Sequence, residues 1–158
     1  MGKDMDPFRA KHSELNQKHL DALTDEGMVI LKVHLVIEEL LRDFCGAVVP
    51  NPKHLREARL TFKQTMLLAR SLTDHDIDWI WAVLRNLNRM RNLMAHAVEP
   101  SEEEYSRCRN TIIQLVSEAR PGGRPDSLKG ALQYAYGWLG GMLSNLVTTK
   151  HLRPQVKS

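Results

Sequence analysis

Residues 85–96, R-N-L-N-R-M-R-N-L-M-A-H, combine a helical apolar pattern with an unusual number of basic side chains. Successive residues of an α-helix turn by about 100°, and apolar residues recur here and just upstream at helical spacing. They are Ile77, Ile80, Leu84, Leu87 and Met94. The stretch therefore predicts a helix with one face in a hydrophobic core, and it points to a helical fold for the chain.

The same rotation divides the polar residues of this stretch into two groups. One group shares a flank of the helix and consists of Arg85, Arg89, Asn92 and His96. Arg91 instead falls within the apolar stripe, between Leu87 and Met94. An arginine is rarely buried without a partner, so we expect an acid, a ligand anion or a second subunit beside Arg91.

The composition of the 158-residue chain is typical of one helical domain. Apolar residues make up 42%, which is enough for a core, and no alternation of β-branched residues indicates strands. The formal charge of +3 permits nucleic-acid binding without requiring it. We therefore expect an all-α protein.

The sequence gives no sign of secretion, membrane insertion or cofactor binding. The N-terminus is polar, and no apolar run is long enough to span a bilayer, so we expect a cytoplasmic protein. Cys45 and Cys108 are the only cysteines and lack zinc-site spacing, so we expect two buried thiols. We expect neither a metal nor another cofactor.

Capping residues, apolar periodicity and Pro/Gly breaks divide the chain into six predicted helices. Residues 73–76 and 101–104 resemble capping boxes, and Gly46 fits the end of a helix. The predicted helices span residues 7–23, 25–45, 53–72 with a break near Thr61, 74–96, 102–120 and 128–149.

Short connections between these helices predict an antiparallel, up-and-down bundle of four main helices, with an additional helix at each end. The bundle takes residues 1–120, a Pro/Gly linker takes 121–125, and a last helix with a basic tail takes 126–158. Three glycines in the last helix would permit a close approach to another helix. They are Gly137, Gly140 and Gly141.

Residues 91–96, R-N-L-M-A-H, resemble the R-N-x-x-x-H signature of the HEPN superfamily of small α-helical bundles. Together with residues 33–41 and 62–72 they look like the mannitol operon repressor branch of that superfamily, over roughly residues 25–120. Many HEPN proteins are metal-independent endoribonucleases. The resemblance implies a composite site at a homodimer interface, with Arg91, Asn92 and His96 as its catalytic residues.

The chemistry of RNA cleavage without a metal suits these residue types. The 2′-hydroxyl must lose a proton, the phosphorane must be stabilised, and the leaving 5′-oxygen must gain a proton. A histidine can exchange protons near neutral pH, and an arginine fork can hold two phosphate oxygens. Arg91 and His96 are five positions apart, about 140° around a straight helix. Both reach one phosphorus only if the last turn is distorted, or if two copies meet across a two-fold axis.

The neighbouring residues have candidate roles and simpler interpretations. Arg85 and Arg89 are candidate RNA-binding residues, or they form an ordinary solvated face. Glu38 is a candidate acid beside Arg91 or Arg89, and a buried salt bridge from Arg91 to Glu38 or its neighbour Glu39 is the structural alternative. Asn92 could orient the imidazole of His96, which lies one turn later, or bind the scissile phosphate.

Two functions follow from the resemblance. The first is an endoribonuclease that serves as the toxin of a toxin–antitoxin or defence system, with an antitoxin as its partner. The second is a non-catalytic bundle like the mannitol operon repressor, a transcriptional regulator or interaction protein in which the same residues hold the homodimer together. No helix-turn-helix with a basic recognition helix is evident in the sequence, so direct DNA binding is the weaker form of the second function. We expect the last helix to add to the dimer interface.

Overall fold

The computed structural model describes residues 6–74 and 77–152 of the chain, and all its regular elements are helices. This confirms the predicted all-α class for the described part. The helices are α1 (Pro7–His19), α2 (Glu26–Val48), α3 (Pro52–Glu57), α4 (Phe62–Ser71), α5 (Asp78–His96), α6 (Glu102–Ala119) and α7 (Leu128–Leu152).

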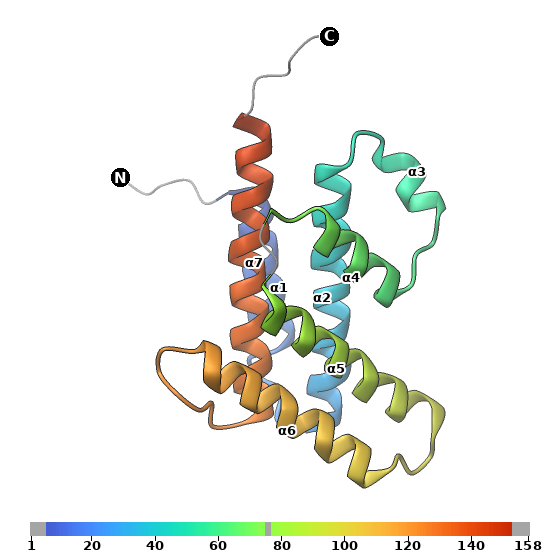
Figure 1. Cartoon of the computed structure of the whole chain (residues 1–158), viewed down its shortest axis with the longest axis vertical. Helices are drawn as coiled ribbons and strands as arrows, with labels where there is room; N and C mark the ends of the chain where they lie inside the picture. The colour runs from blue at the N-terminus through green and yellow to red at the C-terminus, as the bar shows by residue number, and fades with distance from the viewer. Residues whose placement is uncertain (1–5, 75–76, 153–158) are drawn as a thin grey trace.

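The two longest helices, α2 and α7, lie side by side along the long axis of the molecule (Figure 1). α5 and α6 form a hairpin that crosses this pair obliquely, and α1 lies behind α7 in this view. α4 packs on α2 and α5, while the short α3 stands off the C-terminal end of α2. The hairpin therefore carries the R-N-x-x-x-H sequence across the front of the molecule.

One hydrophobic core is shared by α2, α4, α5, α6 and α7. The helix after the Pro/Gly linker packs inside this core together with the helices before it, through buried residues that include Leu128, Leu132, Leu139 and Leu143. α7 is continuous despite its glycines. A Cβ added at Gly137, Gly140 or Gly141 would meet no atom within 4 Å, so close helix packing does not require these glycines.

The helical spacing of the apolar residues of α2 predicts one buried face, and this prediction is partly wrong. Val36, Leu40 and Phe44 are buried, as their spacing predicts. Met28 and Leu35 are instead 43% and 57% exposed, because the stripe that they share points away from the other helices. α2 therefore exposes an apolar stripe to solvent in the single chain.

The helix ends differ from the predicted ends at two places. α5 begins at Asp78, after an Ile77 N-cap that gives no side-chain hydrogen bond, and therefore starts later than the predicted residue 74. The Thr73 hydroxyl donates to the Arg70 carbonyl oxygen, and the capping box predicted at residues 73–76 includes residues 75–76, which lie outside the described part. α2 continues through Gly46 to Val48.

Two other boundaries agree with the sequence. The predicted break near Thr61 is confirmed, because Thr61 is the N-cap of α4. It forms a capping box with Gln64, in which the side chain of each residue accepts from the backbone N–H of the other. The Ser101 hydroxyl accepts a hydrogen bond from the Glu104 backbone N–H at the start of α6.

Candidate functional site

The polar flank of α5 faces solvent and borders an open hollow of about 360 Å³. The hollow is lined by Arg85, Asn88, Arg89, Asn92, Leu93, His96 and Ala97. Four of the predicted site residues are among them, namely Arg85, Arg89, Asn92 and His96. The division of the stretch by helical rotation therefore predicts which polar residues share one surface.

The two arginines of this hollow differ in their ionic contacts. Arg89 Nη2 donates to Glu104 Oε1 of α6 at 2.7 Å, which ties the middle of α5 to the start of α6. Arg85 is exposed and forms no ion pair with an acid in the described part of the chain. Arg85 is therefore the cation of the hollow that is available to an anionic ligand.

His96 is the last residue of α5 and is exposed at the end of the hollow. The chain becomes extended at Ala97, with φ −135° and ψ 138°, so the backbone leaves the helix immediately after the imidazole. Asn92 lies one turn earlier on the same flank. Both side chains can reach a ligand in the hollow.

Arg91 lies on another face of α5 and does not line the hollow. Its side chain is half-buried, and Nη1 donates to Asn92 Oδ1 at 3.4 Å. Its charge adds to the lowering of the pKa of the buried His34 of α2. A single chain therefore does not bring Arg91 and His96 into one hollow.

The acid expected beside Arg91 or Arg89 is not Glu38. The Glu38 carboxylate accepts from Arg42 Nη2 at 2.8 Å, because the two side chains are neighbours one turn apart on α2. Glu39 binds Lys11 of α1 at 2.8 Å. No carboxylate in the described residues forms an ion pair with Arg91, so the salt-bridge interpretation of this arginine is also wrong for the single chain.

His34 is a structural residue, although its spacing of four from Glu38 on α2 is also that of an ordinary surface pair. Its ring is buried, stacks on Phe62 of α4 at 4.1 Å and places Nε2 3.0 Å from Asn88 Oδ1. Burial lowers the pKa of His34; the Asn88 hydrogen bond and the Glu38 charge oppose this shift, and the Arg91 charge adds to it. The Asn88 contact links this buried ring to the wall of the hollow.

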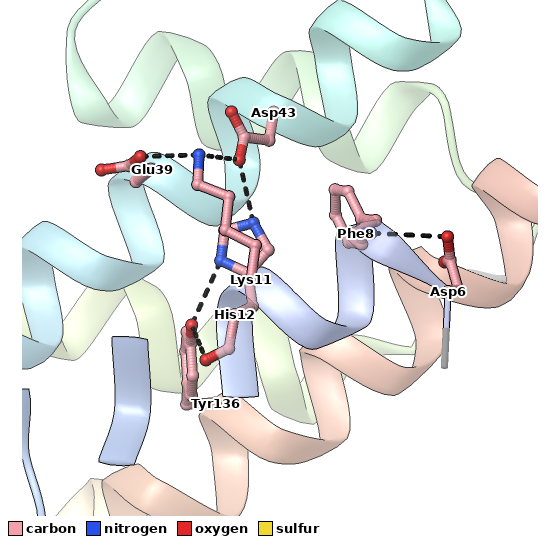
Figure 2. Close-up of polar contacts among 7 residues, drawn as sticks. All are labelled: Asp6, Phe8, Lys11, His12, Glu39, Asp43 and Tyr136. Carbon is pink, nitrogen blue, oxygen red and sulfur yellow. Dashed lines mark hydrogen bonds and ion pairs between the residues drawn. The ribbon is translucent and has the colours of Figure 1, made fainter. Parts of the chain in front are cut away.

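A second polar cluster joins α1, α2 and α7 at His12, which is 3% exposed (Figure 2). His12 Nε2 lies 3.0 Å from Asp43 Oδ2, and Nδ1 lies 3.2 Å from the Tyr136 hydroxyl. That hydroxyl donates to the His12 carbonyl oxygen at 2.8 Å. Lys11 Nζ bridges Asp43 and Glu39 at 2.7 and 2.8 Å.

The hydrogen bonds and ion pairs of this cluster link α1, α2 and α7. Burial acts to raise the pKa of Asp43, but the hydrogen bonds from His12 and Lys11 outweigh it and leave this pKa below its ordinary value. No local pattern predicts the cluster, because His12 lies 31 positions from Asp43 and 124 from Tyr136. α1 has few apolar residues, and the burial of His12 becomes apparent only in the folded chain.

The cysteines are buried free thiols, as predicted. Burial raises the pKa of Cys45 to about 11 and also raises that of Cys108, so neither is a reactive thiolate at neutral pH. Among the residues that the structure describes, no three His, Cys, Asp or Glu side chains are grouped so that they could hold a metal ion.

Comparison of the chain with protein-family models, with curated proteins and with solved structures found no match. The HEPN resemblance therefore rests on the R-N-x-x-x-H sequence and its surroundings. Within the described part of the chain, no helix has the length and apolar character needed to cross a membrane.

Proposed function

We propose that this chain is a metal-independent endoribonuclease of the HEPN type that acts as a homodimer, as the toxin of a toxin–antitoxin or defence system. The observation that carries this proposal is the open hollow on α5, which gathers Arg85, Arg89, Asn92 and His96. Basic and amide side chains on an exposed surface suit a phosphate backbone. An antitoxin would inhibit the enzyme by covering this hollow.

Each residue of the hollow has a role in this proposal. Arg85, which has no acid partner in the described residues, binds a phosphate oxygen. Arg89 adds a second cation, reduced in effect by its contact with Glu104. His96 exchanges the proton of the 2′-hydroxyl or the 5′-oxygen, and Asn92 donates to the scissile phosphate.

Arg91 completes the site only in a dimer, because it lies outside the hollow of its own chain. In the proposed arrangement, a two-fold axis beside the C-terminal half of α5 brings Arg91 of one copy to the hollow of the other. The apolar surroundings of Arg91 then belong to a subunit seam.

An exposed apolar stripe on α2 supports this place for the seam. Met28, Leu31 and Leu35 recur at spacings of three and four, and the first and last of them are well exposed. The stripe adjoins the end of α5, because a Cβ added at Gly27 would lie 3.2 Å from Met94 Cε. A second copy would bury this stripe together with the flank of Arg91.

The HEPN resemblance also implies a four-helix antiparallel bundle, which we assign to α2, α4, α5 and α6. The contacts of α2 with α4 and α5, and of α5 with α6, support this assignment. α7 packs against both α2 and α6, so it is an integral part of the core that surrounds the proposed bundle.

Incubation with labelled RNA in the presence of EDTA tests the proposed activity. Wild type should cleave, while His96→Ala and Arg91→Ala should each lose most of the cleavage. Arg107→Ala is the matched control, because this exposed arginine of α6 forms an ion pair, among the described residues, only with Glu103 one turn away. Cleavage that EDTA abolishes, or that His96→Ala retains, would overturn the proposal.

A second candidate function is a non-catalytic regulator or interaction protein like the mannitol operon repressor. The separation of Arg91 from the hollow of its own chain favours this candidate, because the arginine then has only an interface role. It is supported if purified wild type cleaves no RNA and Arg91→Ala dissociates the dimer.

A further inference from the structure

A second cavity, of about 630 Å³, lies at the C-terminal end of α2. It is bordered by α2, α3, the connection to α4 and α4 itself. Figure 1 shows the chain leaving α2 and arching back through α3 to α4. Its volume is within the range of small-molecule sites in proteins. It is well separated in sequence from the α5 hollow, and the two share no lining residue.

The cavity combines an apolar floor with basic side chains. Its apolar lining is formed by Cys45, Pro52, Leu55 and Leu60. Its basic lining is formed by Arg42, Arg56 and Arg59. Arg42 is paired with Glu38, whereas Arg56 and Arg59 form no ion pair with any acid among the described residues.

Asp43 is the one acid that lines this cavity, and its charge is already compensated. Its Oδ2 atom accepts from both Lys11 Nζ and His12 Nε2, at 2.7 and 3.0 Å (Figure 2). The carboxylate therefore opposes an anion in the cavity only weakly, and Arg56 and Arg59 decide the sign of the electrostatic potential there.

The backbone at Arg59 ends α3 and places this side chain at the cavity. Its φ is +47°, and no other residue with a side chain has a positive φ in the described part of the chain. Helices commonly end with a left-handed residue directly after the C-cap, and Arg59 follows the Ala58 C-cap of α3. This turn carries the charged Arg59 side chain to the cavity wall.

We propose that this cavity binds a small organic anion that has an apolar body and one carboxylate or phosphate group. Arg56 and Arg59 bind the charged group, and the apolar floor covers the body. An inorganic anion alone leaves the floor uncovered, and a neutral apolar molecule leaves the arginines unpaired. The proposal is independent of RNA cleavage, which takes place on α5.

Calorimetric titration with four probes separates these contributions. 1-Naphthyl phosphate and 1-naphthoate carry both parts, 1-naphthol carries only the body, and inorganic phosphate carries only the charge. The proposal predicts that one or both of the first two bind at least about tenfold more tightly than the last two. The tighter of the two then tells whether the natural ligand is a phosphate ester or a carboxylate. Equal affinity for 1-naphthol would overturn the proposal.

Gly46→Leu tests the location of binding. Gly46 lines the cavity, and a Cβ there would meet no atom within 4 Å, so a leucine fits the helix and occupies the cavity. Gly140→Leu is the matched control, because this glycine of α7 has the same open surroundings and lines a different cavity. Binding should be lost in the first variant and kept in the second, and the opposite result would contradict the assignment.

Arg56→Gln combined with Arg59→Gln tests the charged part without altering the core, because both side chains are exposed. This double variant should bind the charged probes at least about tenfold more weakly and should retain the wild-type thermal unfolding transition. Arg107→Gln is the control and should bind as wild type does. Unchanged binding by the double variant would refute the proposed role of the arginines, whatever the behaviour of Gly46→Leu.

Discussion

His34 of α2 and Asn88 of α5 are joined by a hydrogen bond of 3.0 Å between Nε2 and Oδ1. Because the amide oxygen of Asn88 accepts this bond from the imidazole, its amide nitrogen remains a donor for the hollow that Asn88 also lines. A buried ring thereby fixes the orientation of a side chain in the proposed RNA site. The core and the site are connected through this pair.

The pH dependence of stability should carry the signature of His34. Its pKa is lowered from the ordinary value of 6.5, chiefly by burial, so the unfolded chain binds this proton more readily than the folded chain. Stability is then fully present above 6.5 and falls as the pH falls from there toward the lowered pKa. Urea unfolding at several pH values should show a weaker decline for His34→Gln than for wild type.

His54→Gln is the control for that series, because this histidine of α3 is exposed. It should leave the pH profile of wild type unchanged. If the free energy of unfolding depends on pH in the same way for His34→Gln and wild type, folding does not lower the pKa of the His34 imidazole.

Arg85→Ala should weaken RNA binding through the loss of one phosphate contact. With a 2′-O-methyl RNA that cannot be cleaved, the slope of log affinity against log salt concentration should fall by about 0.7 to 1. Arg107→Ala, on α6, should leave both the affinity and the slope unchanged. Equal salt slopes for wild type and Arg85→Ala would place RNA elsewhere on the protein.

Leu35→Glu should convert the proposed dimer into monomers, because it puts a charge on the exposed apolar stripe of α2. Leu67→Glu is the matched control, since this leucine of α4 is similarly exposed, at 49%. Sedimentation at micromolar concentration should give dimers for wild type and Leu67→Glu only. A Leu35→Glu protein that remains dimeric would exclude this stripe from the seam.

Asp43→Asn should destabilise the fold, because it removes the negative charge that the buried His12 and Lys11 share and puts an amide in its place. The expected loss in free energy of unfolding is about 1–3 kcal/mol. Glu39→Gln, which removes only the negative charge of the exposed ion pair with Lys11, should cost less than about 1 kcal/mol. Urea denaturation measures both, and equal losses would show that the Asp43 contact with the imidazole adds no stability.

Local patterns predicted most of the helices and one surface of the site. The rotation of about 100° per residue gathers Arg85, Arg89, Asn92 and His96 on one flank, where the hollow lies. The irregular apolar spacing between residues 53 and 72 predicted a break near Thr61, where the structure divides α3 from α4. Such features depend on residues within one or two turns, so the sequence displays them directly.

Contacts between distant residues could not be predicted in this way. The exposure of Leu35 depends on where α4 and α5 lie against α2. Glu38 forms its ion pair with Arg42 and not with an arginine of α5, which also depends on how the helices pack. The burial of His12 requires α2 and α7 to meet α1. Periodicity gives the apolar face of a helix, but only packing decides which part of that face is covered.

Mixing two inactive variants tests the composite dimer site most directly. After subunit exchange between Arg91→Ala and His96→Ala, a mixed dimer holds one site in which the arginine of one copy and the histidine of the other are both intact. The proposed site predicts that the mixture regains about a quarter of the wild-type RNA cleavage, while each variant alone remains inactive. A mixture that stays inactive, although mixed dimers have formed, would contradict a site shared between two copies.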